Sequence, residues 1–274
     1  MPARDLPLLI EAARAAGEIA TRYSGKLARR WDKPEGAGPV TEADIAVNDM
    51  LAAMLPSARP GYGWLSEETE DDGARLNHDR LFIVDPIDGT RSFADGKRTW
   101  AHSIAVAEHG RITAAVIYLP LLDRLFAAAE GQGATLNAVP IATSQPAGLS
   151  TAEILATRPN LEPTHWRDGH VPAFARAYRP SLAYRLALVA QGRFDGMLTL
   201  RPSWEWDIAA GDLILREARG RCTDRHGAAL RFNNSHPTVE GVIAAGPLVH
   251  RALSEALEPD DAVIPGTPPD PPAP

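Results

Sequence analysis

The chain has 274 residues, of which 45% are hydrophobic and 23% charged, a composition typical of a globular protein with one large or two modest domains. Its 28 basic and 35 acidic residues give a formal net charge of −7, which argues against binding a nucleic-acid polymer through its phosphates. The sequence has no apolar run of about 18 residues, and acids interrupt its apolar N-terminal stretch, so neither a membrane span nor a secretory signal is expected.

The N-terminal part predicts two helices joined by an irregular segment. Apolar side chains recur at helical spacing over residues 6–24, which predicts an amphipathic helix. Residues 25–40 are polar, basic and interrupted by Gly and Pro, so a loop or a twisted ribbon is expected. Thr41, with Asp44 three residues later, is typical of a capping box, and the second helix is expected over residues 42–55.

A meander of strands is expected next. Apolar or alternating runs predict strands at residues 63–66, 81–84, 101–107, 112–119 and 124–129, and one more hairpin tip at 136–140. An acidic stretch, residues 67–72, follows the first of these strands. The second strand is expected to stop at Asp85-Pro86-Ile87-Asp88-Gly89-Thr90, because proline and glycine favour a turn there.

The second half predicts shorter elements around an irregular, Pro-rich segment at residues 158–180. Strands are expected at residues 154–156, 196–200 and 242–245, and helices at residues 181–190, 207–219 and 248–257. Gly220 is expected to close the helix that Asp207 begins. Residues 259–274 are rich in proline and poor in apolar side chains, so a disordered tail is expected.

These elements predict an α+β fold with two halves. Strand meanders alternate with helix pairs, which favours layers of sheet and helix over one doubly wound sheet. We place the N-terminal half, with most of the candidate metal ligands, at residues 1–147 and the C-terminal half at residues 148–258, with a cleft shared between them.

Four acidic side chains stand at the ends of predicted elements. Asp85 ends an apolar strand, and Asp88 follows across the proline turn. Glu67 comes just after another strand, and Asp207 begins a helix. Each has an ordinary explanation alone, as a turn residue, a solvated acid or a helix cap. Together they predict a site for hard divalent cations, which bind several oxygen ligands; two such ions, roughly 3.5–4 Å apart, would hold a phosphate and acidify a water.

The same residues carry a resemblance to a known family. Gly89 and Thr90 follow Asp88, and their backbone N–H groups would face an anion if a helix begins there. Glu67, the run 85–90 and the run Trp206-Asp207-Ile208-Ala209-Ala210-Gly211 resemble the upstream Glu and the two signature motifs of the inositol monophosphatase superfamily. Pro39-Val40-Thr41-Glu42-Ala43-Asp44 is similar to a further segment of that family.

The resemblance extends from about residue 5 to 257 and implies both a fold and a chemistry. The implied fold is a layered α-β-α-β-α sandwich, and the implied activity is that of a Mg²⁺-dependent, lithium-sensitive phosphomonoesterase with two or three ions. It implies that Glu67, Asp85 and the Ile87 carbonyl hold a first Mg²⁺. It implies that Asp85, Asp88 and Asp207 hold a second.

The resemblance also implies how the attacking water is activated. It places that water near Glu67 and Thr90, and it links the Thr90 hydroxyl to Asp44. The residues support this implication, because a Thr hydroxyl is a poor base alone and a buried carboxylate could accept its proton. Asp44 also has an ordinary role as a helix-capping carboxylate, and the two roles are compatible.

Two local features bear on the substrate. Inositol monophosphatases have an acid shortly before the second motif that binds the inositol hydroxyls, and here Thr199 or Leu200 stands at that position. Arg91 after the first motif, and Glu205 in the second, instead resemble the CysQ-like 3′(2′),5′-bisphosphate nucleotidase branch. Arg91 would bind a second phosphate, and Trp204 or Trp100 would stack on an adenine.

The expected reaction is therefore hydrolysis of adenosine 3′,5′-bisphosphate to AMP and phosphate, with inositol-1-monophosphatase activity as the alternative. The substrate-binding set is Asp88, Gly89, Thr90, Arg91 and Asp207. Two readings from other classes stay open. A covalent phosphoaspartate hydrolase would have only one residue between its two acids, whereas Pro86 and Ile87 separate these. A non-catalytic regulator that binds a phosphate ligand would be expected to have lost some of these acids.

The expected partner is a small phosphate ester, with no nucleic-acid polymer and no membrane. A homodimer is left open. Cys222 is the single cysteine, so no internal disulfide can form, and a cytoplasmic location is the simplest expectation.

Overall fold

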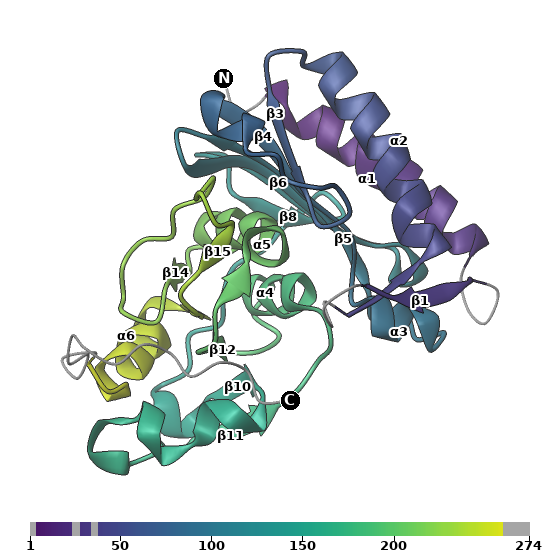
Figure 1. Cartoon of the computed structure of the whole chain (residues 1–274). Helices are drawn as coiled ribbons and strands as arrows, with labels where there is room; N and C mark the ends of the chain where they lie inside the picture. Colours follow the sequence, from purple (N-terminus) through teal and green to yellow (C-terminus); the bar gives the residue numbers. More distant parts are fainter. Residues whose placement is uncertain (1–3, 24–27, 34–37, 260–274) are drawn as a thin grey trace, which may run out of the picture.

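A computed structural model describes residues 4–23, 28–33 and 38–259. Its helices and sheets form five layers (Figure 1). Helices α1 (Leu6–Arg22) and α2 (Glu42–Ala58) cover one face of a large sheet, and α5 (Glu205–Glu217) packs on its other face. Helix α4 (Leu182–Ala190) joins α5 to a smaller sheet, which α6 (Pro247–Ala256) covers on the outside. The predicted α-β-α-β-α sandwich is confirmed.

The large sheet has seven strands in the order β3-β4-β5-β6-β7-β8-β9. Strand β3 runs parallel to β4, and every later pair is antiparallel. The strands are β3 (Gly63–Ser66), β4 (Arg80–Asp88), β5 (Ala101–Glu108), β6 (Arg111–Leu119), β7 (Arg124–Ala129), β8 (Ala134–Leu136) and β9 (Val139–Pro140). The predicted meander is confirmed.

The smaller sheet has five strands in the order β11-β10-β12-β16-β14. They are β10 (Glu153–Ala156), β11 (Ala175–Ala177), β12 (Gly196–Thr199), β14 (Arg221–Thr223) and β16 (Val242–Ala245). Two ribbons complete the strands: β1 (Arg30–Asp32) with β2 (Pro39–Thr41), and β13 (Ser203–Trp204) with β15 (Thr238–Val239). The sequence did not predict β11, β13, β14 or β15, because segments of two or three residues have no measurable alternation.

Short helices fill several connections. They are α3 (Thr90–Ala94) and the 3-10 helices η3 (Ala74–Asn77), η4 (Pro120–Leu122), η5 (Leu149–Thr151), η6 (Arg158–Leu161), η7 (Pro163–His165) and η8 (Arg167–Gly169). The described helices include none with the length and apolar character needed to cross a membrane. The predicted tail lies outside the described residues from residue 260 onward, and the division at 147–148 stays a prediction.

The central helix pair is packed without space for a side chain at Gly211. A Cβ built there would collide with Leu186 of α4. The backbones of α4 and α5 therefore approach closely, and α5 in turn packs on β5 and β6 of the large sheet. The last glycine of the second motif thus has a packing role that fixes α5 against both neighbouring layers.

Three predicted details were wrong. The run 85–90 is not a free turn: β4 continues to Asp88 with a register shift between Asp85 and Asp88. Helix α5 begins two residues before Asp207, with Trp204 as its N-cap. The same helix ends at Glu217, and Arg219 rather than Gly220 takes the left-handed conformation after it, with φ +66°. Pairing with β5 explains the first of these, because it keeps the Asp-Pro segment extended.

Candidate metal centre and active-site pocket

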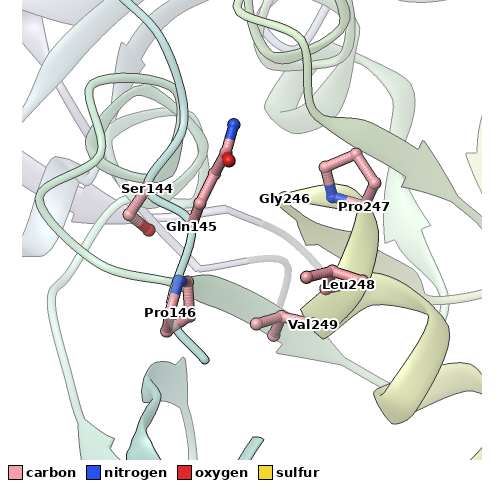
Figure 2. Close-up of a pocket in the computed structure, with 7 residues that line it drawn as sticks. All are labelled: Ser144, Gln145, Pro146, Gly246, Pro247, Leu248 and Val249. Carbon is pink, nitrogen blue, oxygen red and sulfur yellow. The ribbon is translucent and has the colours of Figure 1, made fainter. Parts of the chain in front are cut away.

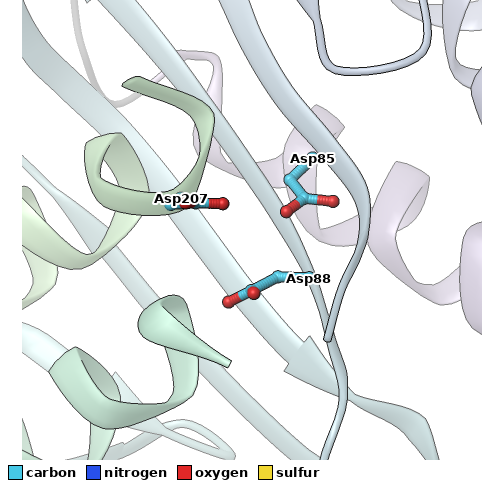
Figure 3. Close-up of side chains that lie close together, drawn as sticks. All are labelled: Asp85, Asp88 and Asp207. Carbon is cyan, nitrogen blue, oxygen red and sulfur yellow. The ribbon is translucent and has the colours of Figure 1, made fainter. Parts of the chain in front are cut away.

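Asp85 and Asp88 of β4 and Asp207 of α5 converge between the large sheet and the helix layer beside it (Figure 3). Each offers one carboxylate oxygen, and these oxygens lie within 4.8 Å of one another. Residues three apart on a regular strand point to opposite faces, but the register shift in β4 turns Asp85 and Asp88 toward the same side. Asp207 approaches from the first turn of α5. The convergence of these acids, which the sequence only suggested, is present in the structure.

The protein around the three acids compensates their charges only in part. Burial raises the pKa of Asp85 well above its ordinary value, and the charges of Glu67, Asp88 and Asp207 raise it further. Burial also raises the pKa of Asp207, and Asp88 and Glu67 add to that shift. Within the described chain, Asp85 Oδ1 has no hydrogen-bond partner. Buried, mutually repelling carboxylates with an orphan oxygen fit a hard divalent cation.

Asp88 is held by the start of α4. Its Oδ2 accepts hydrogen bonds from Ser181 Oγ at 2.6 Å and from the Ala183 N–H at 2.7 Å. These bonds lower the pKa of Asp88, but burial outweighs them and raises it to about 6. Ser181 also caps α4 by accepting from the Tyr184 N–H. One carboxylate of the cluster is therefore oriented by a helix of the C-terminal half.

Thr90 and Asp44 meet behind the cluster. Thr90 Oγ1 lies 3.2 Å from Asp44 Oδ1 and 3.1 Å from the Ile87 carbonyl oxygen. Asp44 Oδ2 accepts from the N–H and the hydroxyl of Thr41, so the predicted capping box is present. Burial raises the pKa of Asp44 to about 6 despite these hydrogen bonds. A Thr hydroxyl thus faces a buried carboxylate that can accept a proton.

Gly89 makes the link between Asp88 and Thr90. Its φ of +95° lies in the left-handed region that favours glycine, and it is the N-cap of α3. A Cβ there would lie 3.4 Å from Ser181 Cβ. The turn is therefore strained for any other residue, and Thr90 faces Asp44 because of it.

Glu67 lines the same pocket but does not join the three-aspartate group. Its Oε1 accepts from Lys33 Nζ at 2.8 Å, and Lys33 also contacts Glu68 at 2.7 Å. Glu67 nevertheless acts electrostatically on the cluster, because it raises the pKa of both Asp85 and Asp207. The sequence gave no signal for Lys33 beyond its place in a basic segment.

The pocket in front of the acids has a volume of about 330 Å³ and is lined from both halves. Three of its lining side chains are arginines, namely Arg91, Arg185 and Arg201. Arg91 was predicted for this place, whereas Arg185 and Arg201 were not. Thr199 also lines the pocket, so no carboxylate stands at the position expected to read inositol hydroxyls.

The predicted stacking tryptophans do not line this pocket. Trp100 is 1% exposed and packs edge-on against Phe93 and His102 in the core. Trp204 is exposed, but it stacks on Trp206 at 4.7 Å and is absent from the pocket lining. The aromatic side chain that does line the pocket is Tyr178.

A second hollow lies between the 144–146 segment and the start of α6 (Figure 2). It is lined by Ser144, Gln145, Pro146, Gly246, Pro247, Leu248 and Val249. None of these side chains is charged, so the hollow has nothing to neutralise a phosphate. The acid-lined pocket is the one with the groups that phosphate chemistry requires.

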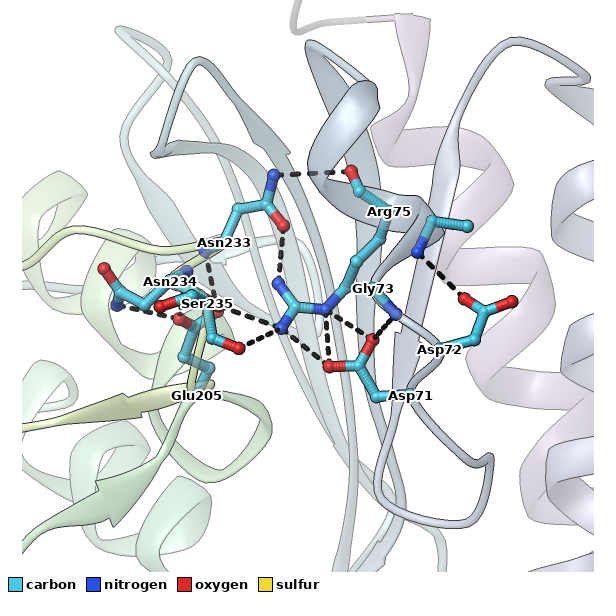
Figure 4. Close-up of polar contacts among 9 residues, drawn as sticks. Asp71, Asp72, Gly73, Arg75, Glu205, Asn233, Asn234 and Ser235 are labelled. Atoms are coloured by element: carbon cyan, nitrogen blue, oxygen red, sulfur yellow. Dashed lines mark hydrogen bonds and ion pairs between the residues drawn. The ribbon is translucent and has the colours of Figure 1, made fainter.

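A second polar cluster, here called the Arg75 cluster, fixes the start of α5 (Figure 4). Glu205 accepts hydrogen bonds from Asn233 N and from both nitrogens of Asn234. Arg75 donates to Asn233 Oδ1, to the Asn234 carbonyl and to the Asp71 carboxylate. The cluster therefore ties the segment after Glu67 to the helix that positions Asp207.

Comparisons with known proteins agree with this geometry. The sequence model of the inositol monophosphatase family matches residues 3–259. An inositol-1-monophosphatase of Mesorhizobium japonicum is 35% identical over 92% of this chain and 96% of that protein. A histidinol-phosphatase of Mycobacterium tuberculosis is 34% identical over 87% of this chain and 94% of that protein. The inositol monophosphatase (IMPase) structure of Thermotoga maritima is 26% identical, with a TM-score of 0.78 over 93% of this chain and 96% of that chain.

Proposed function

Because this chain belongs to the inositol monophosphatase family of phosphatases, we propose that it is a Mg²⁺-dependent phosphoric monoester hydrolase whose metal ligands are Glu67, Asp85, the Ile87 carbonyl, Asp88 and Asp207. The observation that carries this proposal is the buried group of three aspartates within 4.8 Å. The raised pKa values of Asp85 and Asp207 support it, because only a cation would keep all these carboxylates ionised at neutral pH. We propose two or three ions.

The side chains of the protein have distinct parts in the proposed reaction. When bound, Mg²⁺ supplies positive charge to the phosphate oxygens and lowers the pKa of a water. Thr90 Oγ1 takes a proton from the attacking water while its own O–H proton passes to Asp44, 3.2 Å away. The new P–O bond forms as the ester P–O bond breaks, and the leaving alcohol takes up a proton from solvent.

Glu67 is proposed to serve both the first ion and the attacking water. Lys33 pairs with its Oε1, and Oε2 is not part of that ion pair. Gly89 and Thr90 contribute backbone N–H groups near the phosphate, and Asp88 and Asp207 help to orient it through the shared ion. These roles make Glu67, Thr90 and Asp44 the catalytic set, as the sequence predicts.

For the substrate we propose adenosine 3′,5′-bisphosphate, which is converted to AMP and phosphate. The arginines that line the pocket support a substrate with more than one anionic group, since guanidinium binds phosphate in a bidentate manner. The lack of a carboxylate at Thr199 also argues against a polyol. Tyr178 replaces the predicted tryptophans as the aromatic side chain available to a base.

Inositol 1-phosphate is a second candidate. It is favoured by the Mesorhizobium relative, which is named an inositol-1-monophosphatase. In that case Asp88 would accept from an inositol hydroxyl, and the arginines would have no specific role. The two candidates differ in the charge of the alcohol that remains after hydrolysis, which is neutral for inositol and anionic for AMP.

A substrate panel with Mg²⁺ tests both the proposed phosphatase activity and the proposed substrate. We expect kcat/KM to be highest for adenosine 3′,5′-bisphosphate among that nucleotide, inositol 1-phosphate, fructose 1,6-bisphosphate and histidinol phosphate. A higher value for inositol 1-phosphate would overturn the substrate. If none of these esters releases phosphate at saturating Mg²⁺, the phosphatase proposal is overturned. A non-catalytic regulator that binds a phosphate ligand would then be favoured. Hydrolysis of a substrate with a chiral phosphoryl group should invert the configuration at phosphorus if water attacks directly, whereas a phosphoaspartate route, with two successive displacements, would retain it.

A further inference from the structure

Arg185 is a buried cation in the wall of the active-site pocket. It is 7% exposed and lines the pocket together with Asp88 and Asp207. Within the described chain, no carboxylate lies within 4.0 Å of its guanidinium to form an ion pair. Burial lowers the pKa of Arg185, which means that the charged form is poorly solvated where it stands. Asp88 and Tyr178 act favourably on this charge, but no ion pair neutralises it, so an anion from outside the chain would stabilise it further.

The guanidinium is held in one orientation. Its Nε donates to the Arg179 carbonyl, and its Cζ lies 4.7 Å from the centre of the Tyr178 ring. These contacts fix the plane of the group without neutralising its charge. A fixed fork of N–H donors loses little entropy when it binds a phosphate or a carboxylate, so this arginine is organised in advance for an anion.

Arg201 adds a second positive charge on the same wall. It is exposed, it lines the same pocket, and its charge lowers the pKa of Arg185. It also lowers the pKa of Asp207, so its field extends to the metal ligands. Two neighbouring cations that repel one another are both stabilised when one anion binds between them.

The position of Arg185 along α4 relates it to the reacting phosphate. Ser181 and the Ala183 N–H hold the Asp88 carboxylate at the start of this helix. Arg185 follows Ser181 by four residues, which is about 6 Å along a helix axis. The side chain reaches back to the Arg179 carbonyl, before the helix begins, so the guanidinium lies in the pocket wall close enough to Asp88 for its charge to lower the pKa of that carboxyl.

We propose that Arg185 and Arg201 form a subsite for a second anionic group, a phosphate or a carboxylate, on the alcohol portion of the substrate. This inference rests on the proposed phosphatase function and narrows it. The preferred esters are those whose leaving alcohol is itself an anion. The two arginines would repel the cationic alcohol histidinol. The neutral polyol inositol has no anionic group to pair with them.

Matched ester pairs test the subsite in the wild-type protein. Adenosine 3′,5′-bisphosphate and adenosine 3′-monophosphate share the same scissile ester, and only the first has a second phosphate. 2-Phosphoglycerate and glycerol 2-phosphate form the corresponding pair for a carboxylate. We expect kcat/KM to be about 10- to 100-fold higher for the doubly anionic member of at least one pair, as for a hydrogen-bonded charge pair. No preference within either pair would overturn the proposal.

Variants assign that preference to Arg185. Arg185→Gln should reduce the preference within the pair at least about 10-fold, mainly by raising KM for the doubly anionic ester, and Arg185→Lys should restore part of it. Arg193→Gln is the matched control, because it removes an exposed arginine just after α4 that lines a different hollow. Equal losses for both members of a pair would mean that Arg185 binds the scissile phosphate or only supports the fold.

A binding measurement separates this proposal from the phosphatase proposal. Calorimetry with AMP and adenosine needs no turnover, and AMP carries the second anion alone. We expect wild-type protein to bind AMP at least about 10-fold more tightly than adenosine, and Arg185→Gln to lose that difference. If wild type releases no phosphate from any ester but still shows this difference, the phosphatase proposal fails and the subsite stands. Equal binding of AMP and adenosine would overturn the subsite whatever the activity.

Discussion

Two buried polar clusters meet at the start of α5, and they are built in opposite ways. The acid cluster brings together Asp85, Asp88 and Asp207 (Figure 3), whereas the Arg75 cluster joins η3 to Glu205 and the 233–235 loop (Figure 4). Both connect the large sheet to α5, and both take charged groups out of water. They differ in whether the protein itself satisfies those groups.

In the Arg75 cluster every charge has its partners inside the chain. Glu205 is 0% exposed, yet three N–H hydrogen bonds meet its carboxylate. Arg75 is 2% exposed and pairs with Asp71 through two of its nitrogens. In the acid cluster the carboxylates raise one another's pKa values more than nearby cations lower them, and Asp85 keeps an orphan oxygen. A satisfied cluster stabilises the fold, whereas an unsatisfied one is completed by something the chain does not supply.

The largest expected effect comes from removing one charge of the acid cluster. Asp88→Asn keeps an oxygen to accept from Ser181 and Ala183, but it removes one negative charge from the proposed site of the second ion. We expect kcat to fall by roughly 10³-fold or more, which corresponds to about 4 kcal/mol of transition-state stabilisation. The measurement is phosphate release at saturating Mg²⁺. Near-normal turnover would contradict the assignment of Asp88.

The same variant also separates activity from folding. Without metal, Asp88→Asn should melt at a higher temperature than wild type, because one of the repelling carboxylates is gone. Asp79→Asn, at a side chain that is 84% exposed, is the control and should change neither quantity. A lower melting temperature for the metal-free Asp88 variant would show that the acid cluster is already satisfied without an ion.

Breaking the Arg75 cluster should instead cost stability. Arg75→Met removes the partner of Asp71 and leaves acceptors at Asn233 and Asn234 unmet. Because the removed guanidinium leaves these acceptors without a donor, whereas the exposed Asp71 can be hydrated, we expect a loss of about 2–3 kcal/mol in the free energy of unfolding. Urea denaturation measures it. Arg111→Met, at a side chain 63% exposed, is the control, with an expected change within about 0.5 kcal/mol.

A small loss of stability in Arg75→Met would contradict the distinction between a structural cluster and a ligand site. If stability falls by less than about 1 kcal/mol, the hydrogen bonds of Figure 4 do not distinguish a structural cluster from a ligand site. If stability falls as expected, the Mg²⁺ concentration at half-maximal activity becomes informative. A rise in that concentration at a temperature where the variant is folded would show that the cluster also positions Asp207.

Two buried carboxyls beside the pocket also give the metal-free protein a pH dependence. Burial raises the pKa of Asp88 from its ordinary value of 3.8 to about 6, and that of Asp44 likewise to about 6. Between about pH 4 and pH 6 the folded protein holds protons that the unfolded chain has released. The contribution of these two carboxyls to the stability of the metal-free protein is therefore fully present below about pH 4 and is lost as the pH rises through about 6, by roughly 3 kcal/mol for Asp88 alone.

Melting temperatures in EDTA and in Mg²⁺ across this pH range measure the effect. Mg²⁺ should reverse the trend, because an ion that binds ionised carboxylates stabilises the folded state more as the protons leave. A metal-free protein whose melting temperature climbs steadily from pH 4 to pH 6 would indicate that the acids are compensated within the chain. The same measurement on Asp88→Asn should show a shallower fall than wild type.

The long elements and the acids were predictable from the sequence, because local signals specify both. Apolar or alternating runs of four to eight residues predicted the strands of the meander, and the two motifs marked Asp85, Asp88 and Asp207. The short strand β14 and the register shift in β4 were not predictable, because pairing with neighbouring strands creates them. Arg75, Lys33 and Arg185 were missed for a related reason. A charged residue in a sequence shows no partner until distant segments are packed against it.

The smallest expected effect concerns Arg91, the exposed arginine at the edge of the acid cluster. Arg91→Ala should raise KM for adenosine 3′,5′-bisphosphate by about 2- to 5-fold and for monophosphates by less, since an exposed charge pair contributes at most about 1 kcal/mol. Salt sharpens the contrast with buried Arg185. At roughly 0.5 M NaCl the Debye length shrinks to a few ångströms, so the effect of Arg91→Ala should largely disappear while that of Arg185→Gln persists. If salt abolishes the effects of both substitutions, the two arginines contribute only a general positive potential. In that case the wall of the active-site pocket has no specific anion subsite.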